Sequence, residues 1–228
     1  GAAIGTEIDS IELFMDNNIQ LHSTSNDSLT VQILLQDIAL GMHLITAVTQ
    51  DTSGLRDSIE FSVMVHNKPA NIQRPNGIRD GITYNDDNPQ SVTLSLFAPY
   101  KEYVYVIGDF NNWLVSESYY MHMDSGSTDS SHFWITIDDL SQGTEYAFQY
   151  LVDGEIRIAD PYTDKILDKW NDNDISNITY PSLKQYPFGL TDHIVSILQT
   201  AQIPFDWDYS DSFIRPDKDQ LIIYELLV

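Results

Sequence analysis

The chain has 228 residues, of which 42% are hydrophobic, so it is long and apolar enough to bury the cores of one or two domains. Its 11 Lys and Arg against 34 Asp and Glu give a net charge of -23, which disfavours binding to nucleic acids and to anionic membrane surfaces. Cysteine is absent, which excludes disulfides and zinc-thiolate sites, and no apolar run is long enough to span a bilayer.

The N-terminal part predicts short β-strands separated by turns. In residues 58–66, Ile59, Phe61, Val63 and Val65 alternate with mostly polar residues, which is typical of a strand with one buried face. Similar segments come before it, at residues 11–15, 29–35 and 43–49. We therefore expect a β-sandwich domain over residues 1–68.

Residues 69–90 are rich in Pro, Gly, Asn and Asp, which predicts a linker. A second set of strands follows, with Asp153-Gly154 as a strong hairpin signal between two of them. The expected strands are residues 91–99, 103–107, 132–137, 145–154 and 155–160. The alternation predicts that the strand 103–107 is at least partly covered on both faces, and it predicts these inward residues in the first and third strands: Val92, Leu94, Leu96, Phe133, Ile135 and Ile137. These strands predict a second β-sandwich over residues 91–180.

Two tryptophans are candidates for ligand contact. The strand 103–107 ends at Gly108, which permits backbone conformations that other residues resist, and Asn111-Asn112 then predict a tight turn before Trp113. A tryptophan in this position either covers the edge of the core or stacks on a sugar. Trp134 lies opposite the inward face of its strand, so a sugar or a neighbouring part of the protein can cover it.

The C-terminal part departs from the strand pattern. The acidic string at residues 171–174 has the oxygen ligands that calcium prefers but not the spacing of an EF-hand, so a solvated turn is the alternative. Residues 221–228, LIIYELLV, are apolar except for Glu225. Such a run is typical of a parallel strand buried on both faces, which needs neighbours and covering helices.

Two of these regions resemble known domains. Residues 41–63 resemble bacterial immunoglobulin-like domains. The series VTLSLFAP, VYVIGDFNNW and FQYLVDGEIRIADPYT resembles carbohydrate-binding module family 48, the early-set domain that precedes the barrel of many glycoside hydrolase family 13 enzymes. Its motifs are Gly108-x-Phe110-Asn111-x-Trp113, Val152-Asp153-Gly154 and Asp160-Pro161.

This resemblance implies a set of carbohydrate-binding residues. Glycogen-binding members carry a tryptophan that matches Trp113, whereas their second tryptophan is Ile156 here and a lysine is replaced by Gln149. A late asparagine of the family aligns with Asn177. With Trp134 added from the strand pattern, the candidate residues are Trp113, Gln149, Asn177 and Trp134, and binding of maltooligosaccharides is expected to be weak.

The resemblance also predicts the architecture. The expected fold is all-β: two immunoglobulin-like sandwiches and an extended segment, residues 181–228, that leads to the first strand of a (β/α)8 barrel, since residues 219–228 resemble the strand that opens the barrel of family 13 amylases. The catalytic carboxylates of that family lie on later barrel strands, so we expect no catalytic residue, metal or cofactor in this chain.

The expected function is that of an accessory region of a starch- or glycogen-active hydrolase, outside the cell or on its surface. Its partners would be an α-glucan and the catalytic barrel of the same protein. The alternative is a structural protein of tandem immunoglobulin-like domains at the cell surface.

Overall fold

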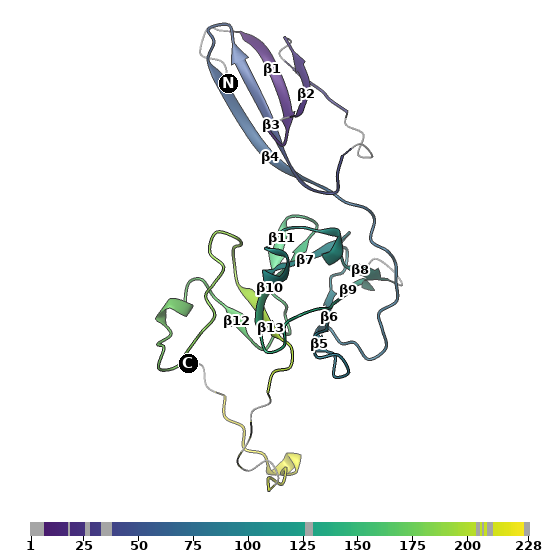
Figure 1. The fold of residues 1–228 in the computed structure, drawn as a ribbon, viewed down its shortest axis with the longest axis vertical. Helices are drawn as coiled ribbons and strands as arrows, with labels where there is room; N and C mark the ends of the chain where they lie inside the picture. Colours follow the sequence, from purple (N-terminus) through teal and green to yellow (C-terminus); the bar gives the residue numbers. More distant parts are fainter. Residues whose placement is uncertain are drawn as a thin grey trace.

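A computed structural model describes residues 7–17, 19–25, 28–32, 38–125, 130–203, 206, 208 and 212–225. These residues form three antiparallel sheets and short 3-10 turns without any α-helix, which confirms the all-β class. Figure 1 shows the N-terminal sheet at one end, a sandwich of two sheets in the middle and a C-terminal segment at the other end. No helix in the described part of the chain could cross a membrane.

The N-terminal sheet has the order β2-β1-β3-β4. Its strands are β1 (Ile8–Met15), β2 (Ile19–Thr24), β3 (Gly41–Asp51) and β4 (Arg56–Val65). The turn between β3 and β4 forms because the Asp51 carboxylate accepts the backbone N–H groups of Ser53 and Leu55, both at 2.9 Å. Met15, Ile45 and Val65 are buried.

This sheet lacks a second layer among the residues described. Ile59 and Phe61 were expected in a sandwich core, but 67% and 51% of their surfaces are exposed. Residues 29–32, expected to start a strand, have no regular structure, and 33–35 lie outside the described residues. The alternation of apolar and polar residues in β4 therefore places the apolar side chains on one face of the sheet, but other described residues bury only part of that face.

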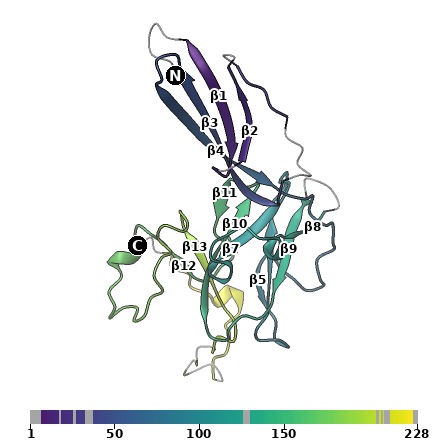
Figure 2. The ribbon, with the colours of Figure 1, turned by 45° about the horizontal axis from the view of Figure 1, so that its top comes forward.

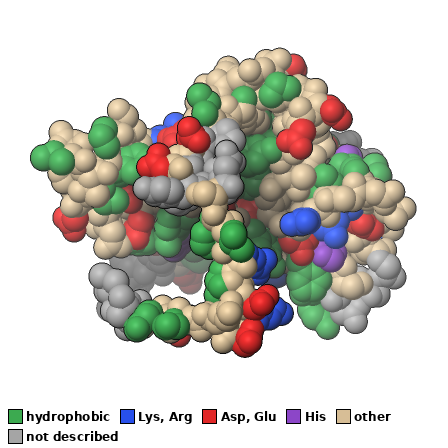
Figure 3. Space-filling view, turned by 90° about the horizontal axis from the view of Figure 1, so that it is seen from below, with side chains coloured by type: hydrophobic (Ala, Val, Ile, Leu, Met, Phe, Trp, Pro, Cys, Tyr) green, Lys and Arg blue, Asp and Glu red, His purple; other side chains and the backbone are tan. Residues whose placement is uncertain are grey.

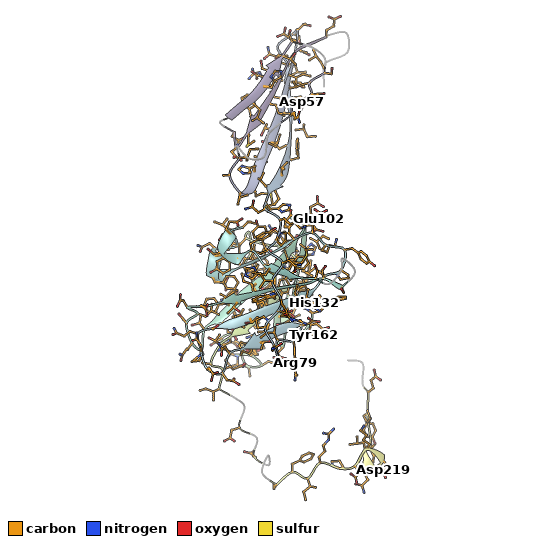
Figure 4. The ribbon with its side chains drawn as sticks, turned by 90° about the vertical axis from the view of Figure 1, so that its right-hand side faces the viewer. Asp57, Arg79, Glu102, His132, Tyr162 and Asp219 are labelled. Atoms are coloured by element: carbon orange, nitrogen blue, oxygen red, sulfur yellow. The ribbon has the colours of Figure 1, made fainter. Side chains whose placement is uncertain are left out.

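The segment that joins the N-terminal sheet to the sandwich is ordered by specific contacts. The rings of His66 and Tyr103 lie 3.6 Å apart between centroids, and the Tyr120 hydroxyl donates to the carbonyl of Asn67. Further on, Arg74 pairs with Asp80 at 2.6 Å. Figure 4 labels Asp57 on the N-terminal sheet and Glu102 at the near end of the sandwich.

The sandwich consists of two sheets. The first has the order β5-β6-β9-β8, and in the second β10 pairs with β7 on one edge and with β13 and β11 on the other. The strands of the first sheet are β5 (Gly81–Tyr84), β6 (Val92–Phe97), β8 (His122–Asp124) and β9 (His132–Ile137). Those of the second are β7 (Val104–Gly108), β10 (Glu145–Val152), β11 (Ile156–Ile158), β12 (Ile166–Leu167) and β13 (Val195–Gln199).

Alternation along the strands builds the core between the two sheets, which face one another in Figure 2. Val92, Leu94 and Leu96, predicted to point inward, are buried against Phe133 and Phe148. On the other face of the second sheet, Tyr105, Ile107 and Leu151 belong to a second core. The second sheet is therefore buried on both faces, as the apolar strand at residues 103–107 predicts.

Two strands of the sandwich lie in segments that were expected to be a linker and a connector. Strand β5 lies within the expected linker 69–90 and pairs with β6 along its whole length. Strand β13 lies within residues 181–228, which were expected to be a connector, and it pairs with β10. The physical reason is that β10 needs a partner along residues 145–148, and a segment far along the chain supplies it.

The C-terminal segment carries a single 3-10 turn among its described residues, Lys218–Gln220. Leu221, Ile222, Ile223 and Tyr224 form no strand and are exposed, and residues 226–228 lie outside the described part of the chain. Figure 4 shows Asp219 on this segment, well away from His132 and Tyr162 of the sandwich.

Candidate functional site

The turn after β7 directs Trp113 back onto the second sheet. The Asn111 side chain donates to the carbonyl of Val106 at 2.8 Å and accepts the N–H of Gly108 at 2.9 Å. Asn112 and Trp113 both adopt left-handed backbone angles, with φ of 54° and 62°. The two asparagines thus close the tight corner that the sequence predicts.

Trp113 lies in the second core, with only 6% of its surface exposed. Its indole N–H donates to the Asp109 carboxylate at 3.1 Å, and that carboxylate also pairs with Lys184 at 2.9 Å. Both the ring and its polar edge are engaged within the protein. Of the two interpretations of Trp113, this arrangement favours the one in which the ring covers the edge of the core. The ring presents no free face on which a sugar could stack.

Gln149 is fully buried on the same face as Trp113. Its amide nitrogen donates to the carbonyls of Asp192 and Ile194, each at 2.8 Å, and its carbonyl oxygen accepts the Thr191 hydroxyl at 2.5 Å. These bonds use both donors of the side chain. Gln149 therefore holds the loop before β13 against the sheet, and it does not face solvent.

The other two candidates lie elsewhere. Trp134 is half-buried on the first sheet, where its indole N–H donates to the carbonyl of Ile72 at 2.9 Å and its ring lies 5.0 Å from that of His122. Asn177 is exposed in the turn around residues 176–180. The structure thus brings Trp113 and Gln149 to one face of the second sheet and leaves Trp134 on the other sheet.

The loop that Gln149 holds forms an open hollow of about 450 Å³, which we call the 189–193 hollow. Glu155, Arg157, Asp192 and His193 contribute to its wall. Arg157 donates to the Thr191 hydroxyl at 3.0 Å, so a side chain of β11 ties the loop down from the side. Ile156, at the position of the family's second tryptophan, is partly exposed on the same strand.

Trp170 stands beside this hollow with 58% of its surface exposed. Its ring centroid lies 6.5 Å from that of His193, and the Lys169 ammonium lies 4.5 Å from the ring. The Asp168 carboxylate fixes the turn by accepting the N–H of Trp170 at 2.9 Å and the Asn171 amide at 2.6 Å. Trp170 is thus an exposed aromatic plate on a tight turn, next to polar groups.

The sequence analysis missed Trp170 as a candidate, because residues 161–180 carry neither a strand nor a helix period. One signal was available. An aspartate two residues before Trp170 and an asparagine directly after it are typical of a turn in which an Asp side chain caps the backbone, and such turns expose the residue that they carry.

The charges around the hollow are mixed. Lys169 binds the Asp192 carboxylate and lowers its pKa, to which the backbone N–H of His193 adds. The pKa of Asp168 is lowered mainly by the backbone N–H of Trp170. Both carboxylates are therefore ionised at neutral pH, with Lys169 and Arg157 close by. With Glu155 also in the wall, the carboxylates outnumber these two cations, so the surface suits an uncharged polar ligand better than an anion.

The acidic string at residues 171–174 forms a 3-10 turn, Asp172–Asp174, in which the Asp172 carboxylate accepts the N–H of Asp168 at 2.9 Å. Among the residues that the structure describes, no three His, Asp or Glu side chains are grouped as metal ligands would be.

Comparisons with known proteins identify part of the chain. The family model "Carbohydrate-binding module 48 (Isoamylase N-terminal domain)" matches residues 81–163, which confirms the predicted resemblance for this part. The match begins at β5 and ends before β12, so it includes Gln149 and Arg157 but not Trp170 or the loop before β13. No curated protein gives a significant match to this sequence.

The solved structures that are similar to the chain include two of the pullulanase SAP from Group B Streptococcus. The structure described as "in complex with maltotetraose" is 15% identical, with 74% of this chain and 21% of the pullulanase covered and a TM-score of 0.30. The other is 17% identical, with the same coverage and the same TM-score. The chain therefore spans about a fifth of the length of these pullulanases.

Proposed function

With a carbohydrate-binding module 48 region at residues 81–163 as the premise, we propose that this chain is a non-catalytic accessory region of an α-glucan-active hydrolase of glycoside hydrolase family 13. The family match is the observation that carries this proposal. The same match favours an accessory region of a hydrolase over a purely structural tandem of immunoglobulin-like domains. In the intact protein the region would support a catalytic barrel, and the protein would act outside the cell or on its surface.

We assign the α-glucan contact to Trp170 and the 189–193 hollow. Trp170 supplies the flat apolar plate that stacks on the C–H face of a glucose unit, while Arg157 and His193 supply polar groups for its hydroxyls. This arrangement replaces the pair of tryptophans that the family resemblance predicts, since Trp113 is buried and Ile156 offers no ring. Gln149 acts as a positioning residue beneath the loop.

One exposed plate supports only weak binding. A stacked ring contributes about 0.5 to 1.5 kcal/mol beyond the burial of its apolar surface, so the loss of both should weaken binding by about tenfold. The test is an NMR titration of the 15N-labelled chain with maltoheptaose, with cellohexaose as the control for linkage. Amide shifts are expected at residues 168–171 and 189–193, and Trp170→Ala should weaken the response by about tenfold.

A matched control is Tyr224→Ala, because Tyr224 is also a highly exposed aromatic residue but lies on the C-terminal segment. Its affinity should equal that of the unmodified chain. Unchanged affinity in Trp170→Ala would overturn the assigned contact, and an equal response to cellohexaose would overturn the α-glucan specificity. Release of reducing sugar from starch by the purified chain would contradict the non-catalytic role.

A further inference from the structure

The segment between the N-terminal sheet and β5 contains the single Asn-Gly pair of the sequence, Asn76-Gly77. The pair forms the centre of a β-turn in which the N–H of Ile78 donates to the carbonyl of Pro75 at 3.3 Å. Gly77 has a φ of 87°, as the third residue of a type II turn requires. Because glycine has no Cβ, its backbone nitrogen can approach the side-chain carbon of a preceding asparagine more closely than that of any other residue.

The turn leaves this approach open. Asn76 and Gly77 are both exposed, and a Cβ placed on Gly77 would meet nothing within 4 Å. Within the described part of the chain, the N–H of Gly77 donates to no backbone carbonyl, so the turn rests on the bond between Pro75 and Ile78. Bringing the nitrogen of Gly77 onto the side-chain carbon of Asn76 therefore breaks one hydrogen bond and displaces no packed side chain.

The chain is anchored on both sides of the turn. Before it, the N–H of Arg74 donates to the Asp124 carboxylate at 2.9 Å, and the Arg74 guanidinium donates to Asp80 at 2.6 Å. After it, strand β5 begins at Gly81 and pairs with β6. Figure 4 labels Arg79, just beyond the turn, on the sandwich. The turn can therefore change its conformation while the sandwich on either side stays folded.

The two Asp-Gly pairs of the sequence, Asp80-Gly81 and Asp153-Gly154, can form the same type of ring but are held in place. The Asp80 carboxylate pairs with Arg74, and a Cβ on Gly81 would lie 2.6 Å from that of Tyr162. The Asp153 carboxylate accepts the N–H of Glu102 at 2.8 Å. Of the three pairs, only Asn76-Gly77 combines an exposed side chain with a glycine that nothing surrounds.

We propose that Asn76-Gly77 is a site of spontaneous deamidation in the folded protein. The backbone nitrogen of Gly77 forms a bond to Cγ of Asn76, and the side-chain amide leaves as ammonia, which carries away the proton of the Gly77 nitrogen. Water then opens the resulting succinimide at either carbonyl and leaves aspartate or isoaspartate at position 76. The sum is water consumed and ammonia released, without oxidation or reduction. The modification goes beyond the proposed function, because it involves neither a sugar nor Trp170.

The test is to age the full 228-residue chain at mildly alkaline pH and to follow its tryptic peptide 57–79 by mass spectrometry. This peptide also contains Asn67 and Asn71, so fragmentation assigns the change from amide to acid and provides two internal controls. Since one hydrogen bond must break, position 76 should react within about tenfold of the rate in a synthetic peptide of residues 72–79. A slower reaction than that, or equal conversion at Asn67 and Asn71, would overturn the proposal.

Two glycine variants test the role of Gly77. Gly77→Ala should slow the reaction at Asn76 by about tenfold or more, because the new Cβ shields the attacking nitrogen. Gly54→Ala is the matched control, since Gly54 also has a positive φ, of 85°, and open space around it, but follows Ser53. It should leave the rate at Asn76 unchanged. A rate in Gly77→Ala equal to that of the unmodified chain would contradict attack by this nitrogen.

The modified chain should keep its other properties. After ageing, amide shifts in the 15N NMR spectrum should change at residues 72–80 and stay the same at residues 189–193, because the turn is anchored on both sides. Its response to maltoheptaose should equal that of the fresh chain, so failure of the proposed glucan contact and failure of this proposal are separate outcomes. Changes throughout the sandwich would show that the reaction follows global unfolding, which contradicts a reaction in the folded protein.

Discussion

At the residue scale, the motif Gly108-x-Phe110-Asn111-x-Trp113 has structural reasons that the sequence does not show. Gly108 has extended backbone angles that any residue can adopt, so the expectation that it needs special conformational freedom is wrong. It is required because a Cβ there would lie 2.5 Å from the carbonyl oxygen of Ala147. The left-handed angles fall instead on Asn112 and Trp113. The motif therefore serves to bury Trp113 and to bring β7 close to β10.

Replacing Gly108 by alanine should lower the free energy of unfolding by about 2 to 3 kcal/mol, because the new methyl group overpacks rigid backbone. Urea unfolding followed by tryptophan fluorescence measures this change. Gly143→Ala is the matched control: its Cβ would meet nothing within 4 Å, so only its positive φ of 71° opposes the change, at a cost of about 1 kcal/mol. Equal losses in the two variants would argue against the close approach as the cause.

At the element scale, the second sheet depends on strands from outside the family match. Strands β12 and β13 follow residue 163, and Leu167, Tyr186 and Val195 from this part complete the second core. They cover Tyr105, Ile107 and Leu151, while β13 pairs with β10 along residues 145–148. The family match thus ends before the strands that complete the second sheet and the second core.

A chain ended at residue 163 should therefore fail to fold, whereas one ended at residue 203 should fold. The shorter chain leaves one face of the second sheet apolar and exposed and one edge of β10 unpaired. Soluble yield and cooperative unfolding by circular dichroism distinguish the two. Cooperative unfolding of the shorter chain at the same midpoint would show that residues 164–203 are dispensable.

In the full chain, Leu167→Ala should lower the free energy of unfolding by about 2 to 4 kcal/mol, because Leu167 is fully buried.

At the scale of the whole molecule, the charge of -23 sets how stability depends on salt. Thirty-four carboxylates face only 11 Lys and Arg, so the ion pairs of the structure leave most of the negative charge uncompensated. Figure 3 shows acidic side chains spread over the face in view, and only few basic ones. Folding brings these charges closer together, which opposes the compact state.

The melting temperature should therefore rise as NaCl is added from about 10 to 150 mM, since the Debye length falls from about 30 Å to about 8 Å over this range. Differential scanning calorimetry at constant pH measures the effect. Sucrose at matched osmolality is the control for changes in water activity. A melting temperature that falls with NaCl would show that attractive ion pairs, such as Arg74 with Asp80, outweigh the general repulsion.

The sequence by itself determined the all-β class, most strands of the sandwich, the inward residues of β6 and β9, and the family of residues 81–163. These features follow from local patterns: a side-chain period of two, glycine and asparagine in turns, and a motif contained within a few residues. Local patterns also gave the alternating face of β4, although they could not tell that Ile59 and Phe61 would stay exposed.

Only the tertiary structure decided which side chains reach solvent. Trp113 and Gln149 became interior residues because a segment some forty to eighty residues further along the chain folds over them. The same segment carries Trp170, which stays exposed on its turn. The residues after β13 meet the turn after β5 and form a cavity there. Burial depends on contacts between distant parts of the chain, and no local period in the sequence encodes those contacts.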